Sequence, residues 1–163
     1  MTPRLFNPAN YWPLVVSLTL TFWLGATVVL DLLVMPALYW GGLMRQSGFA
    51  SFGYLVFSWF NHAELLLAAL VMTSVLAQSF QPPRHYRWGL LLASALVGIT
   101  LIYTYILTPW LGETSAALTW LTDEKGIPVT MHLLHGEYFA LECLKVLVGG
   151  SLLWWQWRYT LAD

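Results

Sequence analysis

Five ionisable residues lie within the last apolar segment of the chain, namely His132, His135, Glu137, Glu142 and Lys145. Histidine and carboxylate side chains bind metal ions, histidine is an axial ligand of haem, and all of these groups can carry protons. An ionisable group inside a bilayer costs roughly 3 kcal/mol or more unless it is paired, hydrated or bound to a ligand. We therefore expect this segment to hold the functional site.

The composition is that of an integral membrane protein in contact with lipid. Of the 163 residues, 58% are hydrophobic and only 9% are charged, whereas soluble domains carry about 25% charged residues. The formal net charge of −1 argues against nucleic-acid binding, which needs a basic surface. The single cysteine, Cys143, excludes an intramolecular disulfide.

Four apolar stretches are long enough to cross the hydrocarbon core of a bilayer, which takes about 20 residues. Prolines near their ends, including Pro36, Pro109 and Pro128, favour helix termini there. The sequence predicts an all-α, four-helix transmembrane bundle that forms a single integral membrane domain over residues 1–163. Its spans are expected at about residues 13–36, 54–78, 88–108 and 130–155.

Basic residues predict the orientation of this bundle. Four of them lie on the side that holds both termini, namely Arg4, Arg84, Arg87 and Arg158. Only Arg45 and Lys125 lie on the opposite side, outside the spans. The positive-inside rule therefore places the N- and C-termini on the cytoplasmic side. The compact size and short loops favour a bacterial inner membrane, with a thylakoid membrane as the alternative.

Polar residues on the first two spans fall at a depth similar to that of the last segment. Asp31, Asn61, His62 and Glu64 lie about 8–15 Å below the outer end of their spans, at about 1.5 Å per residue. Asn61 and Glu64 are neighbours on one helix face at positions i and i+3, whereas His62 points the opposite way. A site built from Asn61 and Glu64 would therefore exclude His62.

Helical periodicity also selects residues on the last span. At about 100° per residue, His135 and Glu142 lie in line on one face, with Lys145 beside them and His132 at the edge of the same stripe. Glu137 points to another face. The centre of the predicted site is therefore His135.

A metal site in the outer half of the bundle is the first hypothesis for this set. His132 and His135 would supply nitrogen ligands, and Asn61 would orient the site. The carboxylates that would balance the charge are those of Asp31, Glu64 and Glu142. A stringent ligand motif such as His-Glu-x-x-His is absent from the sequence.

Haem b is the second hypothesis. Four-helix bundles hold haem between facing helices through axial histidines. His62 and His135 would be the ligands here, although the helical phase of His62 argues against its taking part.

Two further hypotheses need no bound cofactor. Glu64, His135, Glu142 and Lys145 could form a pathway for protons or a small solute. Alternatively, the polar groups only hold the helices together, with Glu142 and Lys145 as an ion pair, and the protein is an accessory or assembly subunit of a larger membrane complex. The sequence has no phosphate loop, nucleophile elbow or dinucleotide fingerprint, which favours a protein that is not an enzyme.

Short motifs on three spans resemble one membrane-protein family. They are residues 23–25 (Trp-Leu-Gly) with 35–39 (Met-Pro-Ala-Leu-Tyr), 108–109 (Thr-Pro) with 113–117 (Glu-Thr-Ser-Ala-Ala), and 134–136 (Leu-His-Gly). From about Trp23 to Gly150 the chain is similar to the transmembrane-protein-205-like family, also called domain of unknown function 4149. Trp110 departs from the pattern, because a basic residue is expected after the proline. The resemblance implies a four-helix integral membrane protein.

Overall fold

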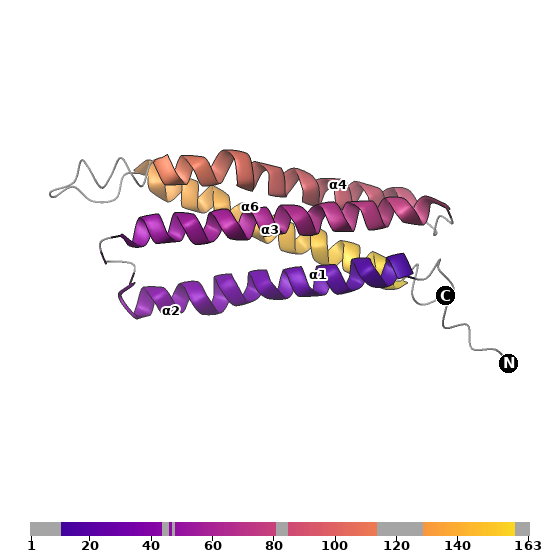
Figure 1. The fold of residues 1–163 in the computed structure, drawn as a ribbon, viewed down its shortest axis with the longest axis horizontal. Helices are drawn as coiled ribbons and strands as arrows, with labels where there is room; N and C mark the ends of the chain where they lie inside the picture. Colours follow the sequence, from indigo (N-terminus) through magenta and orange to yellow (C-terminus); the bar gives the residue numbers. More distant parts are fainter. Residues whose placement is uncertain (1–10, 44–45, 47, 81–84, 114–128, 159–163) are drawn as a thin grey trace.

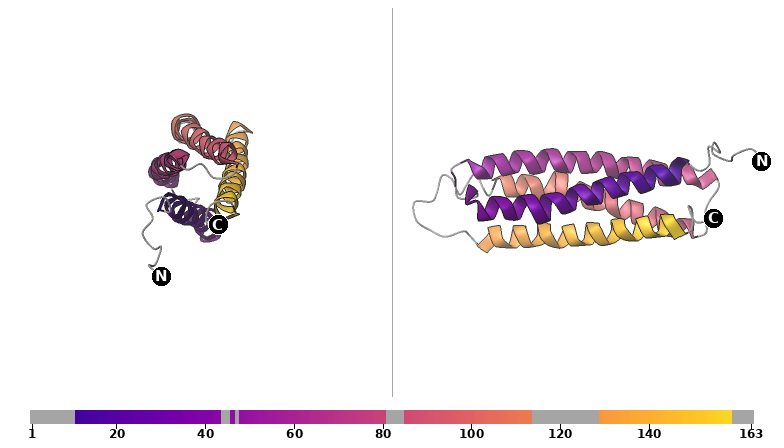
Figure 2. Two further views of the ribbon diagram at one scale, coloured as in Figure 1. Left: turned by 90° about the vertical axis from the view of Figure 1, so that its right-hand side faces the viewer. Right: turned by 90° about the horizontal axis from the view of Figure 1, so that it is seen from below.

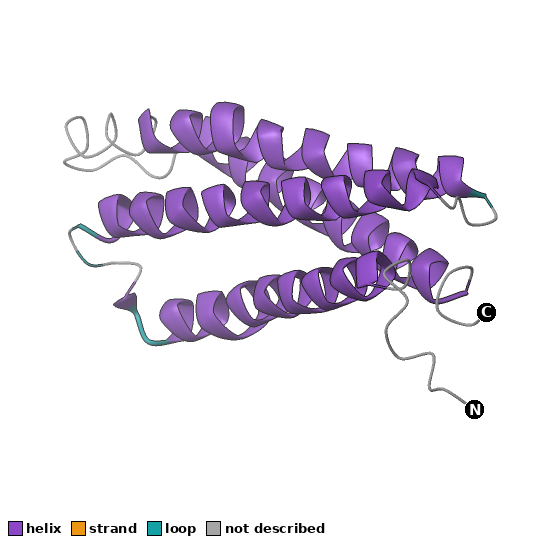
Figure 3. Cartoon of the chain, turned by 45° about the vertical axis from the view of Figure 1, so that its right-hand side comes forward, coloured by secondary structure: helices purple, strands orange, loops and turns teal. Residues whose placement is uncertain are grey.

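The computed structural model describes residues 11–43, 46, 48–80, 85–113 and 129–158, and leaves the side chains of residues 50, 80 and 129–135 undescribed (Figure 1). In this part of the chain every regular element is a helix (Figure 3). Four helices are long and apolar enough to cross a membrane, so the protein is an integral membrane protein. The predicted all-α, four-helix bundle is confirmed.

The first span consists of three consecutive helical segments, α1 (Tyr11–Val29), η2 (Leu30–Val34) and α2 (Met35–Trp40). The second is α3 (Phe49–Ala77), which ends in the short 3₁₀ turn η4 (Gln78–Phe80). The third begins with α4 (Tyr86–Ile102) and η5 (Tyr103–Leu107), and its helix continues to Glu113. The fourth is α6 (Val129–Gln156).

The four spans run antiparallel, and each packs against two neighbours. The close pairs are α1 with α3, α3 with α4, α4 with α6, and α6 with α1. The end-on view in Figure 2 shows this square arrangement, in which α1 lies diagonally opposite α4 and α3 lies opposite α6. The first span begins and α6 ends at the same end of the bundle, which we call the terminal end, and the opposite end is the distal end.

Apolar side chains fill the half of the bundle nearer the terminal end. All four spans contribute buried residues to this core: Val16, Leu20, Trp23, Ala68, Val71, Val75, Ala93, Leu96, Leu152 and Trp155. One close approach fixes two of the helices, because a Cβ atom on Gly89 would lie only 2.5 Å from the indole ring of Trp155. The terminal half is therefore tightly packed and mainly apolar.

Two π-helical turns interrupt the first and third spans, and each ends two residues before a proline. In η2 the N–H of Met35 donates to the carbonyl of Leu30, and in η5 the N–H of Thr108 donates to Tyr103. Pro36 and Pro109 follow immediately. A proline ring crowds the carbonyl of the preceding turn, and a wider turn makes room for it. Both helices consequently continue past the prolines, to Trp40 and Glu113, instead of ending there.

Candidate functional site: a buried lysine between two glutamates

Lys145 lies at the centre of the bundle, between two glutamate side chains. Its Nζ atom lies 2.6 Å from Glu64 Oε1 on α3, and 2.7 Å from Oε2 and 2.9 Å from Oε1 of Glu142, one turn away on α6. The exposed fractions of Lys145, Glu64 and Glu142 are 0%, 1% and 5%. Because α3 and α6 are diagonal partners, the bond to Glu64 crosses the middle of the bundle.

Two donors from α1 complete the surroundings of Glu64. Trp23 Nε1 donates to Glu64 Oε1 at 2.8 Å, and Thr27 Oγ1 donates to the same oxygen at 3.2 Å. Charge-assisted hydrogen bonds of this kind are about twice as strong as neutral ones. The other oxygen, Oε2, is buried and has no hydrogen-bond partner among the described residues. Glu64 thus joins α1, α3 and α6 through one oxygen atom.

Asn61 organises a second, uncharged network one turn earlier on α3. Its Nδ2 donates to Thr108 Oγ1 at 2.6 Å, and its Oδ1 accepts from the Tyr138 hydroxyl at 3.1 Å. Thr104 Oγ1 donates to the backbone carbonyl of Asn61 at 3.3 Å. Asn61 is fully buried, and these bonds satisfy both ends of its side chain. The network ties α3 to the third span and to α6.

Aromatic rings contact the lysine and hold the networks in place. Lys145 Nζ lies 5.2 Å from the ring centroid of Tyr103 and 5.9 Å from that of Phe60, which are cation–π distances. The ring of Tyr103 is 4.7 Å from that of Tyr138, and its hydroxyl donates to the backbone carbonyl of Tyr138 at 3.3 Å. The ring faces partly replace the water that the ammonium group lacks.

Asp31 adds a third carboxylate to this environment. It is half-buried in η2 and interacts electrostatically with Lys145, Glu64 and Glu142. We call Asp31, Glu64, Glu142 and Lys145 the charged cluster. With every member ionised, three negative charges and one positive charge sum to −2. The cluster therefore carries more carboxylate than its lysine can neutralise.

A cavity of about 250 Å³ lies next to the charged cluster, toward the distal end. All four spans line this distal pocket, and its walls are mainly apolar and aromatic. The lining residues are Asp31, Met35, Tyr54, Phe57, Thr108, Leu111, Gly112, Tyr138, Phe139 and Glu142. Glu142 belongs to both the charged cluster and the wall of the distal pocket.

Of the residues selected from the sequence, five lie together. They are Asp31, Asn61, Glu64, Glu142 and Lys145. His62 lies on the exposed side of α3, where its Nδ1 is 2.7 Å from the backbone carbonyl of Ser58. The backbones of His132 and His135 belong to α6, but their side chains lie outside the described part of the structure.

Several members of the site were not selected from the sequence. Trp23, Thr27 and Thr104 donate hydrogen bonds to Glu64 or Asn61. A signal for Trp23 did exist, because tryptophan in membrane proteins favours the interface, whereas Trp23 lies well inside its span. A buried indole N–H requires an acceptor, so this position could have been searched for one.

The described side chains contain no group of three or more His, Cys, Asp or Glu residues placed to hold a metal ion. Comparisons with known proteins add no family: no family model matches the chain, and no curated protein or solved structure is significantly similar to it. The function must therefore be argued from the charged cluster and the distal pocket themselves.

Proposed function

We propose that this integral membrane protein binds a small solute in the distal pocket and couples that binding to protonation of the charged cluster. The observation that carries the proposal is the double role of Glu142, which pairs with Lys145 and also lines the pocket. Any charge placed in the pocket therefore acts directly on the ion pair. Conversely, a proton on Glu142 changes the charge that the solute meets.

Charge balance supports proton binding. A net charge of −2 within a bilayer would be strongly unfavourable, and each protonated carboxyl removes one negative charge. Neighbouring carboxyl groups commonly share a proton, because two like charges at close range disfavour each other. Asp31 and Glu142 both line the distal pocket. They are therefore the carboxyl groups that can exchange a proton with the contents of the pocket.

The packing of the bundle supports access from the distal end. On the terminal side of the charged cluster, apolar residues from all four spans fill the interior, including Leu20, Val71, Leu96 and Leu152, none of which is exposed at all. These side chains separate the charged cluster from the terminal end. In this conformation, protons and solute would enter through the distal pocket.

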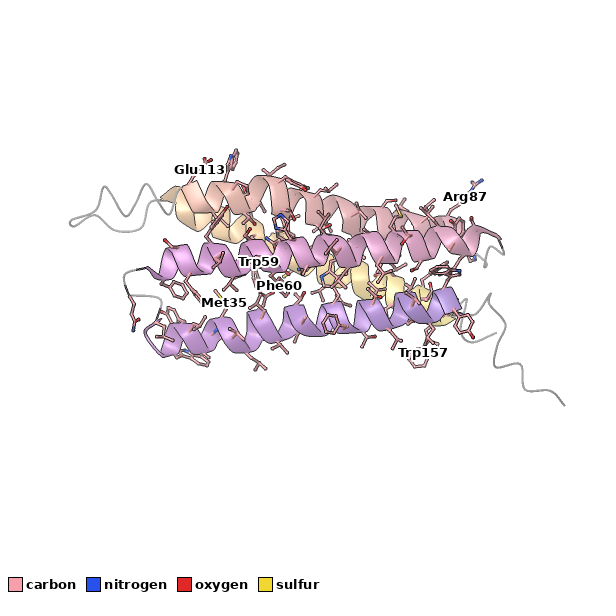
Figure 4. The ribbon with its side chains drawn as sticks, in the orientation of Figure 1. Met35, Trp59, Phe60, Arg87, Glu113 and Trp157 are labelled. Carbon is pink, nitrogen blue, oxygen red and sulfur yellow. The ribbon has the colours of Figure 1, made fainter. Side chains whose placement is uncertain are left out.

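The orientation and membrane expected from the sequence are part of the proposal. Figure 4 places Arg87 at the terminal end and Glu113 at the distal end, which agrees with a cytoplasmic terminal end. The solute would then enter from outside a bacterial inner membrane or from the thylakoid lumen. Membership of the transmembrane-protein-205-like family is proposed on the motifs quoted above.

Infrared difference spectroscopy of the protein in lipid nanodiscs tests proton binding directly. At about pH 7 we expect the absorption band of a protonated carboxylic acid, lost in Glu142→Gln or Asp31→Asn. The matched control is Glu137→Gln, which changes an exposed carboxylate on the same helix and should leave the band unchanged. Absence of the band from the wild-type protein at every pH at which the bundle is folded would contradict the proposal.

Metal and haem binding remain separate hypotheses, because they depend on His132 and His135. A visible spectrum and a metal analysis of the purified protein decide them. A Soret band that is lost in His135→Ala would favour the haem hypothesis. One equivalent of bound metal would favour the metal-site hypothesis. Colourless, metal-free protein that co-purifies with a stable partner, and lacks the infrared band, would favour the accessory-subunit hypothesis.

A further inference from the structure

The distal pocket points to the chemical class of the solute. We propose that it is a small organic ammonium ion with an apolar body, and this inference rests on the proposed function only for its coupling to protons. Three properties of the pocket carry it: aromatic walls, two carboxylates with no basic residue among the described lining residues, and a small volume.

Four aromatic side chains form much of the wall, namely Tyr54, Phe57, Tyr138 and Phe139. The rings of Phe57 and Tyr138 meet edge to face, with centroids 5.6 Å apart. The Tyr138 hydroxyl donates to Asn61. The Tyr138 ring is therefore held both by the Phe57 ring and by this hydrogen bond. Aromatic faces attract quaternary and protonated amines, and cages of such rings with a carboxylate are the usual way proteins bind them.

The charges in the lining favour a cation over an anion. Asp31 and Glu142 line the distal pocket, whereas none of its described lining residues is lysine, arginine or histidine. Glu142 is only 5% exposed, and Lys145 pairs with it at 2.7 Å from behind the pocket wall. Asp31, half-buried at the same cavity, is the carboxylate that a bound ammonium group can approach.

The volume and the remaining walls limit the solute to a small, mainly apolar molecule. At about 250 Å³, the cavity is slightly smaller than most small-molecule sites, which start at about 300 Å³. Met35 and Leu111 contribute apolar surface. Tyr54 packs directly on Gly112, where an added Cβ atom would lie 2.7 Å from the ring. The absence of a side chain at Gly112 therefore leaves room for the Tyr54 ring in the pocket wall.

An ammonium ion would exchange with protons. A solute that brings one positive charge neutralises one carboxylate, so a proton that this carboxylate held can leave to the solvent. No covalent bond changes in this exchange. The number of protons released on binding therefore measures how the solute and the charged cluster are coupled.

Isothermal titration calorimetry of the protein in nanodiscs tests both parts of this inference. The probe is benzyltrimethylammonium, whose charge does not depend on pH, and the control probe is neopentylbenzene, its neutral isostere. We expect the cation to bind at least about tenfold more tightly than the neutral compound. Equal affinity for the two compounds, or binding of neither, would overturn the ammonium assignment.

Two variants separate the contributions of charge and ring. Asp31→Asn should weaken benzyltrimethylammonium binding about tenfold or more, because it removes the half-buried carboxylate of the pocket wall. Phe139→Leu, at an exposed aromatic residue of the wall, should weaken it about threefold. Glu113→Gln is the matched control, since this exposed carboxylate at the distal end is not among the lining residues. If it weakened binding as much as Asp31→Asn, the pocket would not be the site.

Proton release distinguishes failure of this inference from failure of the proposed function. Titrations in two buffers of different ionisation enthalpy give the protons released per cation bound, which we expect to be near one around neutral pH. Tight cation binding without proton release at any pH would keep the ammonium site and overturn the coupling. The infrared carboxyl band without cation binding would keep proton binding and overturn the ammonium site.

Discussion

Lys145 and Glu64 form an ion pair across the centre of the bundle, with Nζ and Oε1 2.6 Å apart. It joins two helices that are otherwise diagonal partners and do not pack closely. Replacement of both residues by apolar side chains can cost little, whereas removal of one leaves an uncompensated charge. Single and double variants should therefore behave very differently.

Lys145→Met should lower the free energy of unfolding by about 3 kcal/mol or more, because Glu64 and Glu142 lose their cation. Unfolding in mild detergent, followed by circular dichroism, measures this loss. The double variant Glu64→Gln/Lys145→Met should recover part of it, because one of the two uncompensated carboxylates is then removed. A double variant less stable than Lys145→Met would be inconsistent with this explanation.

Trp23→Phe should destabilise the protein by about 1.5–3 kcal/mol, because the indole N–H donates to a buried carboxylate and phenylalanine cannot. Trp59→Phe is the matched control on α3. Trp59 is 73% exposed, so its replacement should change the stability by less than about 0.5 kcal/mol. Equal effects of the two variants in thermal unfolding would show that the Trp23 hydrogen bond contributes nothing.

Gly89→Ala should destabilise the bundle by about 1–3 kcal/mol, because the new methyl group would overlap the ring of Trp155. Gly98→Ala, on the same helix, meets nothing within 4 Å and should raise the stability by up to about 1 kcal/mol. The melting temperatures of the two variants should therefore shift in opposite directions. A shift in the same direction would contradict the close packing of α4 on α6.

A buried glutamine pair near the terminal end gives a fourth prediction. Gln156 Nε2 donates to Gln78 Oε1 at 3.3 Å, and within the described structure Gln78 Nε2 and Gln156 Oε1 have no partner. Gln156→Leu should lower the free energy of unfolding by about 1 kcal/mol, since it leaves the buried side chain of Gln78 without its hydrogen bond. The double variant Gln78→Leu/Gln156→Leu should be at least as stable as the wild type. A double variant less stable than either single one would argue for bound water or a ligand at this pair.

The four spans could be predicted from the sequence alone. In a bilayer each apolar stretch must form its backbone hydrogen bonds within itself, and it therefore forms a helix. The relation between Asn61 and Glu64 could be predicted as well, since a period of 3.6 residues places both on the buried face and His62 on the other. Both results depend only on local geometry.

The contacts between spans could not be derived in this way. The bond from Lys145 to Glu64 depends on how α6 is rotated toward α3, which no local pattern specifies. The bond from Trp23 depends likewise on the rotation of α1. The sequence predicts helix ends at Pro36 and Pro109, because proline usually ends a helix. In the structure a π turn before each proline lets the helix continue, and such turns have no recognisable sequence pattern. The cytoplasmic location of the termini stays a prediction.

The two π turns also divide the bundle mechanically. They lie in the diagonally opposed first and third spans, and in this structure α3 and α6 run without such a break through the level of the charged cluster. α3 and α6, which carry Glu64, Glu142 and Lys145, are continuous helices at this level, whereas the other two spans each contain a wider turn there. Bending at the two π turns would shift Asp31 and Thr108 in the wall of the distal pocket and leave the ion pairs of Lys145 intact. Such bending would change the width of the pocket without moving the apolar core of the terminal half.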